Sequence, residues 1–379
     1  MRVIQPGSTI GMLGGGQLGR MSVLAGRDMG YRFCVLEPKA PSAAGMVADA
    51  QIETAYDDEA GLKAFASQID IATLEFENIP ARALDILMDS VTVYPGRRAL
   101  EICQNRSREK QFLKDSGIPC APFEVVRSLP ELETAVGQIG LPAVLKTADF
   151  GYDGKGQVKI EPGMDLEPIW APYEGHAAVL EGWVNFSGEY SVICGRNFKG
   201  ETCVYPLVHN THRDHILFTT VGPTGLDERL EGEAREIALA IADGLELIGL
   251  VAVELFLTDK GWVVNEMAPR PHNSGHLSID SHVTSQFEQH IRLVCGLTPG
   301  ETRQHTPACM LNLLGDVWAK GTPDWAFILQ DSRCKLHLYD KGEPRNGRKM
   351  GHISFLGESP DDCLQRALEC DRRLYEAIK

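Results

Sequence analysis

The sequence of 379 residues lacks long apolar runs and any paired cysteine motif. No stretch approaches the ~20 apolar residues that a membrane-spanning helix needs, and the first residues do not have the layout of a signal peptide. The ten cysteines are scattered without C-x-x-C spacing, which is typical of small core residues in a reducing compartment. These absences predict a soluble, cytoplasmic protein that does not contact a membrane.

Basic residues are in the minority. Lysine and arginine total 37 against 52 aspartates and glutamates, which gives a formal net charge of -15 and a pI of about 5.2. Such a chain is not expected to bind nucleic acid or an anionic membrane, although a local basic pocket can still hold a small anion. The length and the 43% of hydrophobic residues predict two or three domains.

Strands and helices alternate over the first part of the chain. This order predicts a parallel sheet with right-handed crossovers, so that the fold class is α/β. The predicted strands are 9–13, 32–36, 71–74 and 91–94, and the predicted helices are 17–29, 59–68 and 81–88.

The rest of the chain mixes its elements and predicts an α+β central part. The predicted helices are 107–115, 130–139, 230–247 and 361–378. The predicted strands are 123–126, 143–146, 177–180, 190–194, 251–257, 308–314, 334–338 and 352–355, with a further strand that ends near Glu266.

Two carboxylates on this predicted strand pair suggest a metal site. Glu254 lies within the first strand, and Glu266 follows Asn265 at the end of the second. Mg²⁺ prefers a few hard oxygen ligands and shares the rest of its shell with phosphate and water. The basic and amide side chains that follow at once, Arg270, His272 and Asn273, suit a small anion.

Glycine-rich turns offer two further candidate sites. The sequence from Gly14 to Gly19 matches G-x-G-x-x-G between a predicted strand and a helix, with Glu37 after the next strand. A dinucleotide, a mononucleotide phosphate and a tight turn without ligand are all compatible with it. The loop Gly151–Gln157 is not a Walker A motif, but with Lys146 it suits either a lid over a polyphosphate or a solvent-exposed hairpin turn.

Three polar segments remain ambiguous from the residues alone. Glu181–Val184 with Glu189 suits the adenine and ribose of a nucleotide, or an ordinary strand and turn. His209, His212 and His215 are spaced like metal ligands, but no helix is predicted to place them on one face. The basic loop 339–352 is either a phosphate clamp or a solvated turn.

The combination of these motifs resembles the ATP-grasp superfamily, and within it the N5-carboxyaminoimidazole ribonucleotide synthetases. The resemblance covers residues 8–375. The segments that carry it are Gly14–Met21 (GGGQLGRM), Glu75–Asn78 (EFEN), Gly151–Gln157 (GYDGKGQ), Asn265–His276 (NEMAPRPHNSGH) and Gly347–His352 (GRKMGH).

The resemblance implies three domains and a homodimer. The domains would be a Rossmann-like unit over residues 1–104, an ATP-grasp unit over 105–300 with a lid over about 120–185, and a C-terminal unit over 301–379. The implied reaction carboxylates 5-aminoimidazole ribonucleotide with bicarbonate and MgATP through carboxyphosphate, in purine biosynthesis.

The resemblance also implies roles for individual residues. ATP would be held by Arg106, Lys146, Gly151, Tyr152, Asp153, Gly154, Lys155, Gly156, Gln157, Glu181, Gly182, Trp183, Val184, Glu189, His212, Asn265 and Glu266. Mg²⁺ would be held by Glu254 and Glu266. Bicarbonate and its phosphorylated form would lie among Tyr152, Arg270, His272 and Asn273. The ribonucleotide would be held by Asp153, Gln17, Leu18, Glu75, Lys341 and Arg348.

Some residues depart from the family's pattern, and other functions compete. Lys155 stands where arginine is commoner, and His209 and His215 are unusual beside His212. A formate-using ATP-grasp transformylase, an NAD-dependent oxidoreductase built on Gly14–Gly19, and a non-catalytic nucleotide-binding module are the alternatives. The NAD alternative leaves Glu254, Glu266 and the glycine-rich lid unexplained.

Overall fold

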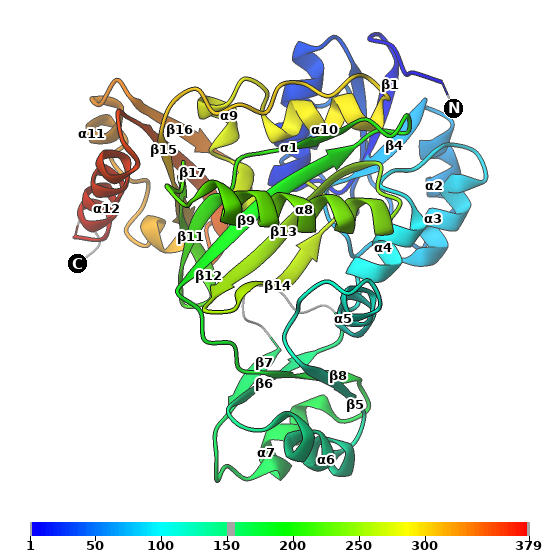
Figure 1. The fold of residues 1–379 in the computed structure, drawn as a ribbon. Helices are drawn as coiled ribbons and strands as arrows, with labels where there is room; N and C mark the ends of the chain where they lie inside the picture. Colours follow the sequence, from blue (N-terminus) through cyan, green and yellow to red (C-terminus); the bar gives the residue numbers. More distant parts are fainter. Residues whose placement is uncertain (1, 150–155, 377–379) are drawn as a thin grey trace.

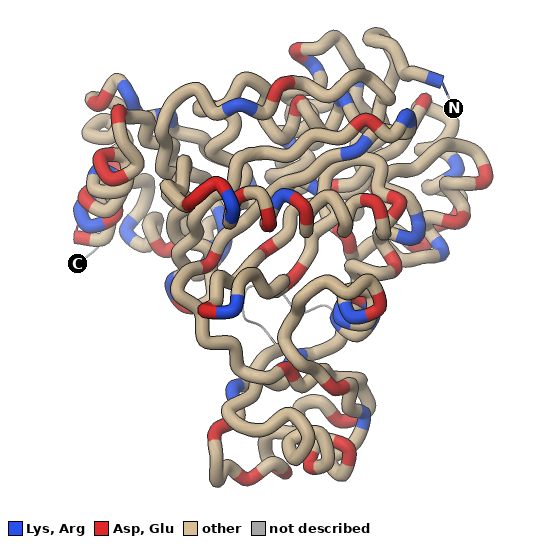
Figure 2. Tube along the Cα trace, viewed as in Figure 1, with Lys and Arg blue, Asp and Glu red and all other residues tan. Residues whose placement is uncertain are grey.

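The computed structural model describes residues 2–149 and 156–376. Three sheets organise this part of the chain, and the smallest antiparallel sheet projects away from the other two (Figure 1). Acidic and basic residues are interspersed along the trace (Figure 2). No helix in the described ranges has the length and apolar character that crossing a membrane requires.

The N-terminal sheet is parallel, with the strand order β3-β2-β1-β4. Three of its four strands read as nearly continuous apolar runs because helices and neighbouring elements bury both of their faces, whereas the edge strand β3 is partly exposed. The strands are β1 (Thr9–Leu13), β2 (Arg32–Leu36), β3 (Ala50–Ile52) and β4 (Ile71–Leu74). The helices are α1 (Gln17–Asp28), α2 (Glu59–Ala66), α3 (Ala81–Met88) and α4 (Arg97–Cys103), with a 3-10 turn η1 (Gly45–Val47).

The parallel order confirms the prediction from the alternating strands and helices, but one predicted strand is wrong. Residues 91–94 form only a single bridge, between Val93 and Ala72. Both Val91 and Val93 are buried. The apolar character that predicted a strand therefore reflects burial rather than a ladder of hydrogen bonds.

The small sheet is antiparallel, with the order β5-β8-β6-β7. It packs against short helices that cover one face, and its own apolar core includes Leu145, Leu180 and Trp170. Its elements are β5 (Phe123–Val126), α6 (Leu129–Ile139), β6 (Ala143–Thr147), β7 (Gln157–Ile160), α7 (Leu166–Trp170), η2 (Ala171–Tyr173) and β8 (Ala178–Gly182). The helix α5 (Arg106–Asp115) precedes this unit.

The large sheet has the order β14-β13-β9-β11-β12-β15-β17-β16, with β10 paired to β9. The strands are β9 (Gly188–Arg196), β10 (Thr202–Val204), β11 (Val208–Arg213), β12 (Ile216–Gly222), β13 (Gly249–Thr258), β14 (Gly261–Ala268), β15 (Ala308–Leu314), β16 (Cys334–Leu338) and β17 (Lys349–Leu356).

Helices cover this sheet and join it to the N-terminal unit. α8 packs on β9 and β13, while α10 packs on the same strands and on α1 (Figure 1). The helices are α8 (Glu228–Gly244), η3 (Asn273–Gly275), α9 (Ser278–Ser281), α10 (Gln286–Val294), η4 (Gly315–Trp318), α11 (Ala326–Leu329) and α12 (Pro360–Glu376).

The last strands of the chain continue the central sheet. β15 pairs with β12 through Leu311 and Thr219, and β17 pairs with β15 through Ile353 and Leu311. Leu311 and Ile353 are fully buried beneath α12. The C-terminal residues are therefore tied to the central unit by backbone hydrogen bonds as well as by apolar packing.

Leu311→Ala tests how far stability depends on the packing of β15 between β12 and β17. Removing a fully buried leucine side chain should lower the free energy of unfolding by about 2–5 kcal/mol, seen as a lower urea midpoint. Leu329→Ala is the matched control, because Leu329 is 59% exposed and its truncation should change stability by less than about 0.5 kcal/mol. Equal midpoints for the two variants would contradict this role for β15.

Candidate functional site

A cleft of about 340 Å³ lies where the N-terminal unit meets β14 and the start of α5. Its lining is mostly polar and comes from segments far apart in the sequence. The lining residues are Gln17, Leu18, Glu75, Phe76, Glu77, Asn78, Cys103, Gln104, Arg106, Glu109, Thr147, Ala148, Glu266, Met267, Ala268, Arg270, His272, Asn273 and Lys349.

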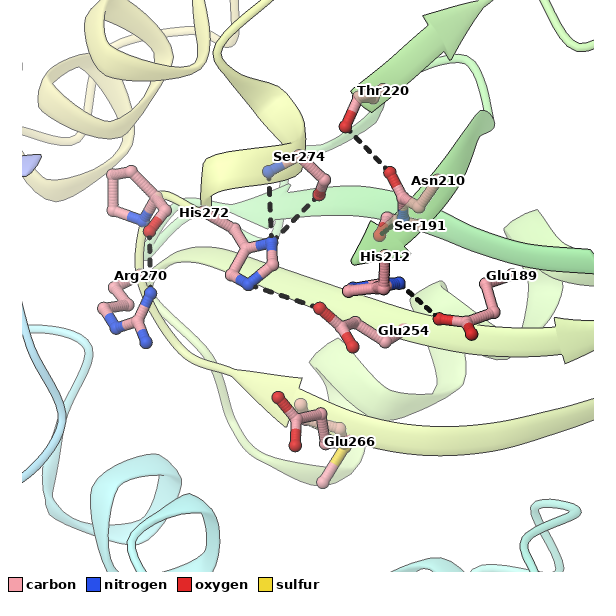
Figure 3. A network of polar contacts seen from close by, with 12 residues as sticks. Glu189, Ser191, Asn210, His212, Thr220, Glu254, Glu266, Arg270, His272 and Ser274 are labelled. Carbon is pink, nitrogen blue, oxygen red and sulfur yellow. Dashed lines mark hydrogen bonds and ion pairs between the residues drawn. The ribbon is translucent and has the colours of Figure 1, made fainter. Parts of the chain in front are cut away.

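The two acids expected to bind metal face each other across β13 and β14. Glu254 is the cross-strand partner of Glu266, and the register shifts immediately afterwards. The shift leaves Asn265 as an extra residue, as in a β-bulge, which re-aims side chains next to it. Figure 3 shows His272 beside Glu254, with its Nε2 3.4 Å from Glu254 Oε1.

Burial and the proximity of Glu266 change the protonation of Glu254. Burial and the neighbouring Glu266 carboxylate raise the pKa of Glu254 to about 8. Burial and the nearby Arg270 guanidinium hold the pKa of His272 well below its usual range. His272 is therefore neutral at pH 7, and its Nδ1 lies 2.9 Å from the hydroxyl of Ser274.

A buried carboxylate, Glu181, gathers three cations next to the cleft. Glu181 Oε2 lies 3.0 Å from Lys146 Nζ and 3.3 Å from Lys110 Nζ, and Glu181 Oε1 lies 3.6 Å from Arg106 Nη1. Burial alone would raise the pKa of Glu181, but the three cations lower it to about 2. Arg106 also reaches Glu266, at 3.4 Å.

Sequence reasoning missed Lys110 and Glu109 within this network. Lys110 has no exposed side-chain surface and donates to the carbonyl of Asn265 at 2.8 Å, while Glu109 accepts from the amide of Met267 at 2.6 Å. The signal was present, because positions 106, 109, 110 and 113 share one face of a helix. Charges on the face that also carries the buried Leu113 indicate an internal network.

His212 is held by Glu189 next to the acid pair. Its Nδ1 lies 2.6 Å from Glu189 Oε2. Burial opposes protonation, but the hydrogen bond to Glu189 raises the pKa of His212. Asn210 on the same strand donates to Ser191 and accepts from Thr220 (Figure 3).

The three histidines of this segment have different neighbours. The His209 ring packs against Tyr190, with 5.0 Å between ring centroids, and His215 Nδ1 lies 3.4 Å from Gln157 Nε2. His212 instead faces Glu189. They do not converge on one point as the ligands of a single metal ion would.

Two carboxylates accept hydrogen bonds from the backbone amides of the glycine-rich turn at the start of α1. The amide of Gly15 donates to Glu37, and the amides of Gly16 and Gly19 donate to the two oxygens of Glu75. Glu37 therefore faces the glycine-rich loop. Lys341 donates to the side chain of Gln17 at 2.7 Å, which brings the C-terminal basic loop to this turn.

Arg270 makes a two-pronged ion pair with Glu77. Its Nη2 donates to Glu77 Oε1 at 3.1 Å, and its Nε donates to Glu77 Oε2. Burial raises the pKa of Glu77, but the guanidinium more than offsets this and leaves it lowered. Asn273 is 6% exposed, and in the described part of the chain its Nδ2 has no acceptor within hydrogen-bonding distance.

Some of the remaining predicted residues lie outside the described part of the chain, and the others are found in the small sheet, the connection to β9 and the basic loop. Gly151, Tyr152, Asp153, Gly154 and Lys155 lie outside the described residues. Gly156 and Gln157 begin the segment that pairs with β6, Gly182 ends β8, and Val184 follows in the connection to β9. Trp183 is 43% exposed, with Lys159 Nζ 4.0 Å above its ring. Arg348 donates to the carbonyl of Glu343 at 2.9 Å.

Three family models match consecutive parts of the chain. They are the ribonucleotide synthetase preATP-grasp domain at residues 7–104, the ATP-grasp domain at residues 111–287, and the phosphoribosylaminoimidazole carboxylase C-terminal domain at residues 308–366. An N5-carboxyaminoimidazole ribonucleotide synthase of Bacillus subtilis strain 168 is 43% identical over 96% of this chain and 95% of its own. The chain belongs to the N5-carboxyaminoimidazole ribonucleotide synthase family.

Solved structures of this family have the same fold. An ADP complex of N5-carboxyaminoimidazole ribonucleotide synthetase has a TM-score of 0.94 and 40% identity, and covers 100% of this chain and 99% of its own. The Aspergillus clavatus N5-carboxyaminoimidazole synthase in complex with ADP and 5-aminoimidazole ribonucleotide has a TM-score of 0.87 and 26% identity, covering 97% and 99%. The predicted α/β fold of this family is confirmed.

The raised pKa of Glu254 predicts how stability depends on pH. Its pKa is about 8 in the folded protein and about 4.3 in an unfolded chain. Between about pH 4.3 and about pH 8, Glu254 is ionised in the unfolded chain but still protonated in the folded protein. The folded state is therefore progressively destabilised over this range, compared with a protein that has a neutral side chain at this position. Glu254→Gln, freed of divalent cations, should have a Tm at least about 3 °C higher than the unmodified protein at pH 8.

This difference in Tm should shrink as the pH falls toward 5. Glu358→Gln is the matched control, because Glu358 is exposed on the surface and its replacement should change the Tm little at either pH. Equal Tm values for Glu254→Gln and the unmodified protein at pH 8 would contradict the crowding of the two carboxylates.

Proposed function

We propose that this ATP-grasp ligase carboxylates 5-aminoimidazole ribonucleotide with bicarbonate and MgATP, forming N5-carboxyaminoimidazole ribonucleotide, ADP and phosphate. The observation that carries the proposal is that one cleft joins two chemically different walls. Arg106 and Glu266 line the wall made by α5 and β14, and Gln17 and Leu18 line the wall made by α1. A nucleotide with its metal and a ribonucleotide phosphate can thus meet in the same space.

Mg²⁺ would be held by Glu254 and Glu266. Both offer the hard carboxylate oxygens that Mg²⁺ prefers, and the raised pKa of Glu254 reflects crowding that a divalent cation would relieve. Bound there, the ion would neutralise charge on the phosphates during transfer. Asn265, which the bulge leaves without a cross-strand partner, would add an amide beside this site.

ATP would lie between the small sheet and the large sheet. Lys146 and Arg106 would exchange part of their contact with Glu181 for the phosphates, since cations pair with phosphate through charge-assisted hydrogen bonds. The segment Gly182–Val184 would offer backbone groups to the adenine. Glu189 with His212 would hold the ribose, and the loop from Gly151 to Gln157 would cover the phosphates.

Bicarbonate would lie beside Arg270, His272 and Asn273. Nδ2 of Asn273 supports this position, because it is a buried donor without an acceptor among the described residues, and a buried donor needs one. One bicarbonate oxygen would attack the γ-phosphorus of ATP, releasing ADP and forming carboxyphosphate. Such an intermediate is short-lived in water. A lid that includes Tyr152 would protect it by closing over the site and excluding water.

The ribonucleotide phosphate would bind at the start of α1. The amides of Gln17 and Leu18 lie in the first helical turn, where an anion is favoured, and Lys341 already contacts Gln17. Arg348 would add a second cation. Glu75 would hold the glycine-rich turn in place through its hydrogen bonds from the amides of Gly16 and Gly19. Asp153 would face the aminoimidazole, whose amine attacks carboxyphosphate, or CO₂ released from it, with loss of phosphate.

We also propose domain limits, an assembly and a location. The limits are 1–104, 105–300 with its lid over about 120–185, and 301–379. The three family models support the outer limits, since they match 7–104, 111–287 and 308–366. A homodimer in the cytoplasm completes the proposal.

The deciding experiment is ADP release from MgATP and bicarbonate, with and without 5-aminoimidazole ribonucleotide. We expect strong stimulation by the ribonucleotide and a carboxylated product that contains label from ¹³C-bicarbonate. ADP release that ignores the ribonucleotide would indicate an ATP-grasp ligase with another acceptor. Absence of ADP release would contradict the proposed activity.

Lys341→Ala tests the ribonucleotide end of the cleft. Loss of a charge-assisted contact worth about 1.5–3 kcal/mol should raise KM for 5-aminoimidazole ribonucleotide at least about tenfold, while KM for ATP should change less than about twofold. Lys335→Ala on β16 is the control, because Lys335 is exposed. Equal changes in both KM values would contradict the assignment.

A further inference from the structure

A group of ionisable side chains lies outside the machinery described so far, where β16 and β17 pack against α9. His337 and His352 are cross-strand partners on these two strands, so their side chains leave the same face of the sheet. Their rings stack with 4.4 Å between centroids and 13° between planes. Asp280 on α9 faces them, with Oδ2 2.8 Å from His337 Nε2.

One possible ligand atom from each of these three residues lies close to those of the other two. The possible ligand atoms of Asp280, His337 and His352 all lie within 4.8 Å of one another. A metal ion with bonds of about 2.0–2.2 Å to nitrogen and oxygen would draw these atoms closer together and tilt the two stacked rings toward each other, so that both lone pairs meet at the ion. The side chains of His337 and Asp280 are 27% and 10% exposed, so that an ion has a path from solvent.

The hydrogen bonding of His352 gives independent support. The residue has no exposed surface, and its Nε2 has no partner within the described residues. Its Nδ1 lies 2.7 Å from the hydroxyl of Tyr339, which is itself buried. When Nδ1–H donates to that hydroxyl, Nε2 keeps a free lone pair, and this is the arrangement that orients metal-binding histidines.

We propose that Asp280, His337 and His352 bind a divalent transition-metal ion, with Zn²⁺ as the preferred species. Two imidazole nitrogens and one carboxylate are typical ligands of Zn²⁺ and of its neighbours Co²⁺ and Ni²⁺, whereas Mg²⁺ and Ca²⁺ prefer oxygen alone. The ion takes the place of the proton that His337 Nε2 shares with Asp280, and water completes the fourth position.

The site is separate from the paired carboxylates and has a structural consequence of its own. His337 and His352 lie on the two strands that border the basic loop, which carries Lys341 and Arg348. A metal ion would tie both ends of that loop to α9. It would thereby fix Lys341 relative to Gln17 without touching a reactant.

Titration of the full-length protein with metal tests the proposal directly. The protein is freed of metal with a chelator, exchanged into buffer with excess Mg²⁺ to occupy hard oxygen sites, and titrated with Zn²⁺ by calorimetry. Co²⁺ serves as a second probe, because its visible absorption reports nitrogen ligands. We expect one equivalent of either ion to bind and the Tm to rise with the metal concentration.

Asp280→Asn and His337→Gln should each weaken Zn²⁺ binding at least about tenfold, since each removes a ligand. His305→Gln is the matched control, because His305 is exposed and lies outside the cluster. This variant should bind Zn²⁺ as tightly as the unmodified protein does. His337 is partly exposed, so this variant keeps the test decisive if Asp280→Asn does not fold.

Absence of Zn²⁺ binding to the unmodified protein would overturn the proposal. Binding that persists unchanged in both Asp280→Asn and His337→Gln would do so too, because the ion would then lie elsewhere. Metal binding and Tm are measured without catalytic turnover, so their outcome does not depend on whether the protein has the proposed carboxylation activity.

Discussion

The buried carboxylate of Glu181 holds together the parts of the site that lie far apart in the sequence. It comes from β8 of the small sheet, and it meets Arg106 and Lys110 from α5 and Lys146 from β6. A buried charge is stable only when it is paired and hydrogen-bonded, so removing one partner would leave the others uncompensated. Two of these cations, Arg106 and Lys110, also reach Glu266 and the carbonyl of Asn265 on β14. The network therefore fixes the small sheet against the strand that carries the acid pair.

A second constraint acts within the large sheet. Pairing of β13 with β14 puts Glu254 opposite Glu266, and the register shift beside them leaves Asn265 unpaired. The sheet continues through β12, β15 and β17, so that the C-terminal loop with Lys341 returns to Gln17 at the start of α1. One continuous sheet thus positions both the acid pair and the cation expected at the ribonucleotide phosphate.

Much of the fold follows from local pattern, and the errors have physical causes. The alternation of apolar strands and amphipathic helices correctly predicted the parallel sheet, because such strands are buried on both faces. The predicted strand at 91–94 was wrong because a buried apolar segment need not form a ladder, and this one makes only the single bridge between Val93 and Ala72. Lys110 was missed because a lysine in a charged helix is normally exposed, and only the packing of α5 under β8 and β14 buries it.

The order of motifs by itself determined the family and the residue types available for phosphate, metal and a small anion, since these chemistries demand glycine, carboxylate and basic groups at particular places. Only the tertiary structure decided how these residues are paired. It joined Arg270 to Glu77, turned Glu37 and Glu75 toward the glycine amides, and brought His337, His352 and Asp280 together. Such pairings depend on contacts between distant segments, and no local pattern encodes the distance between two side chains that meet only when the sheets and helices pack.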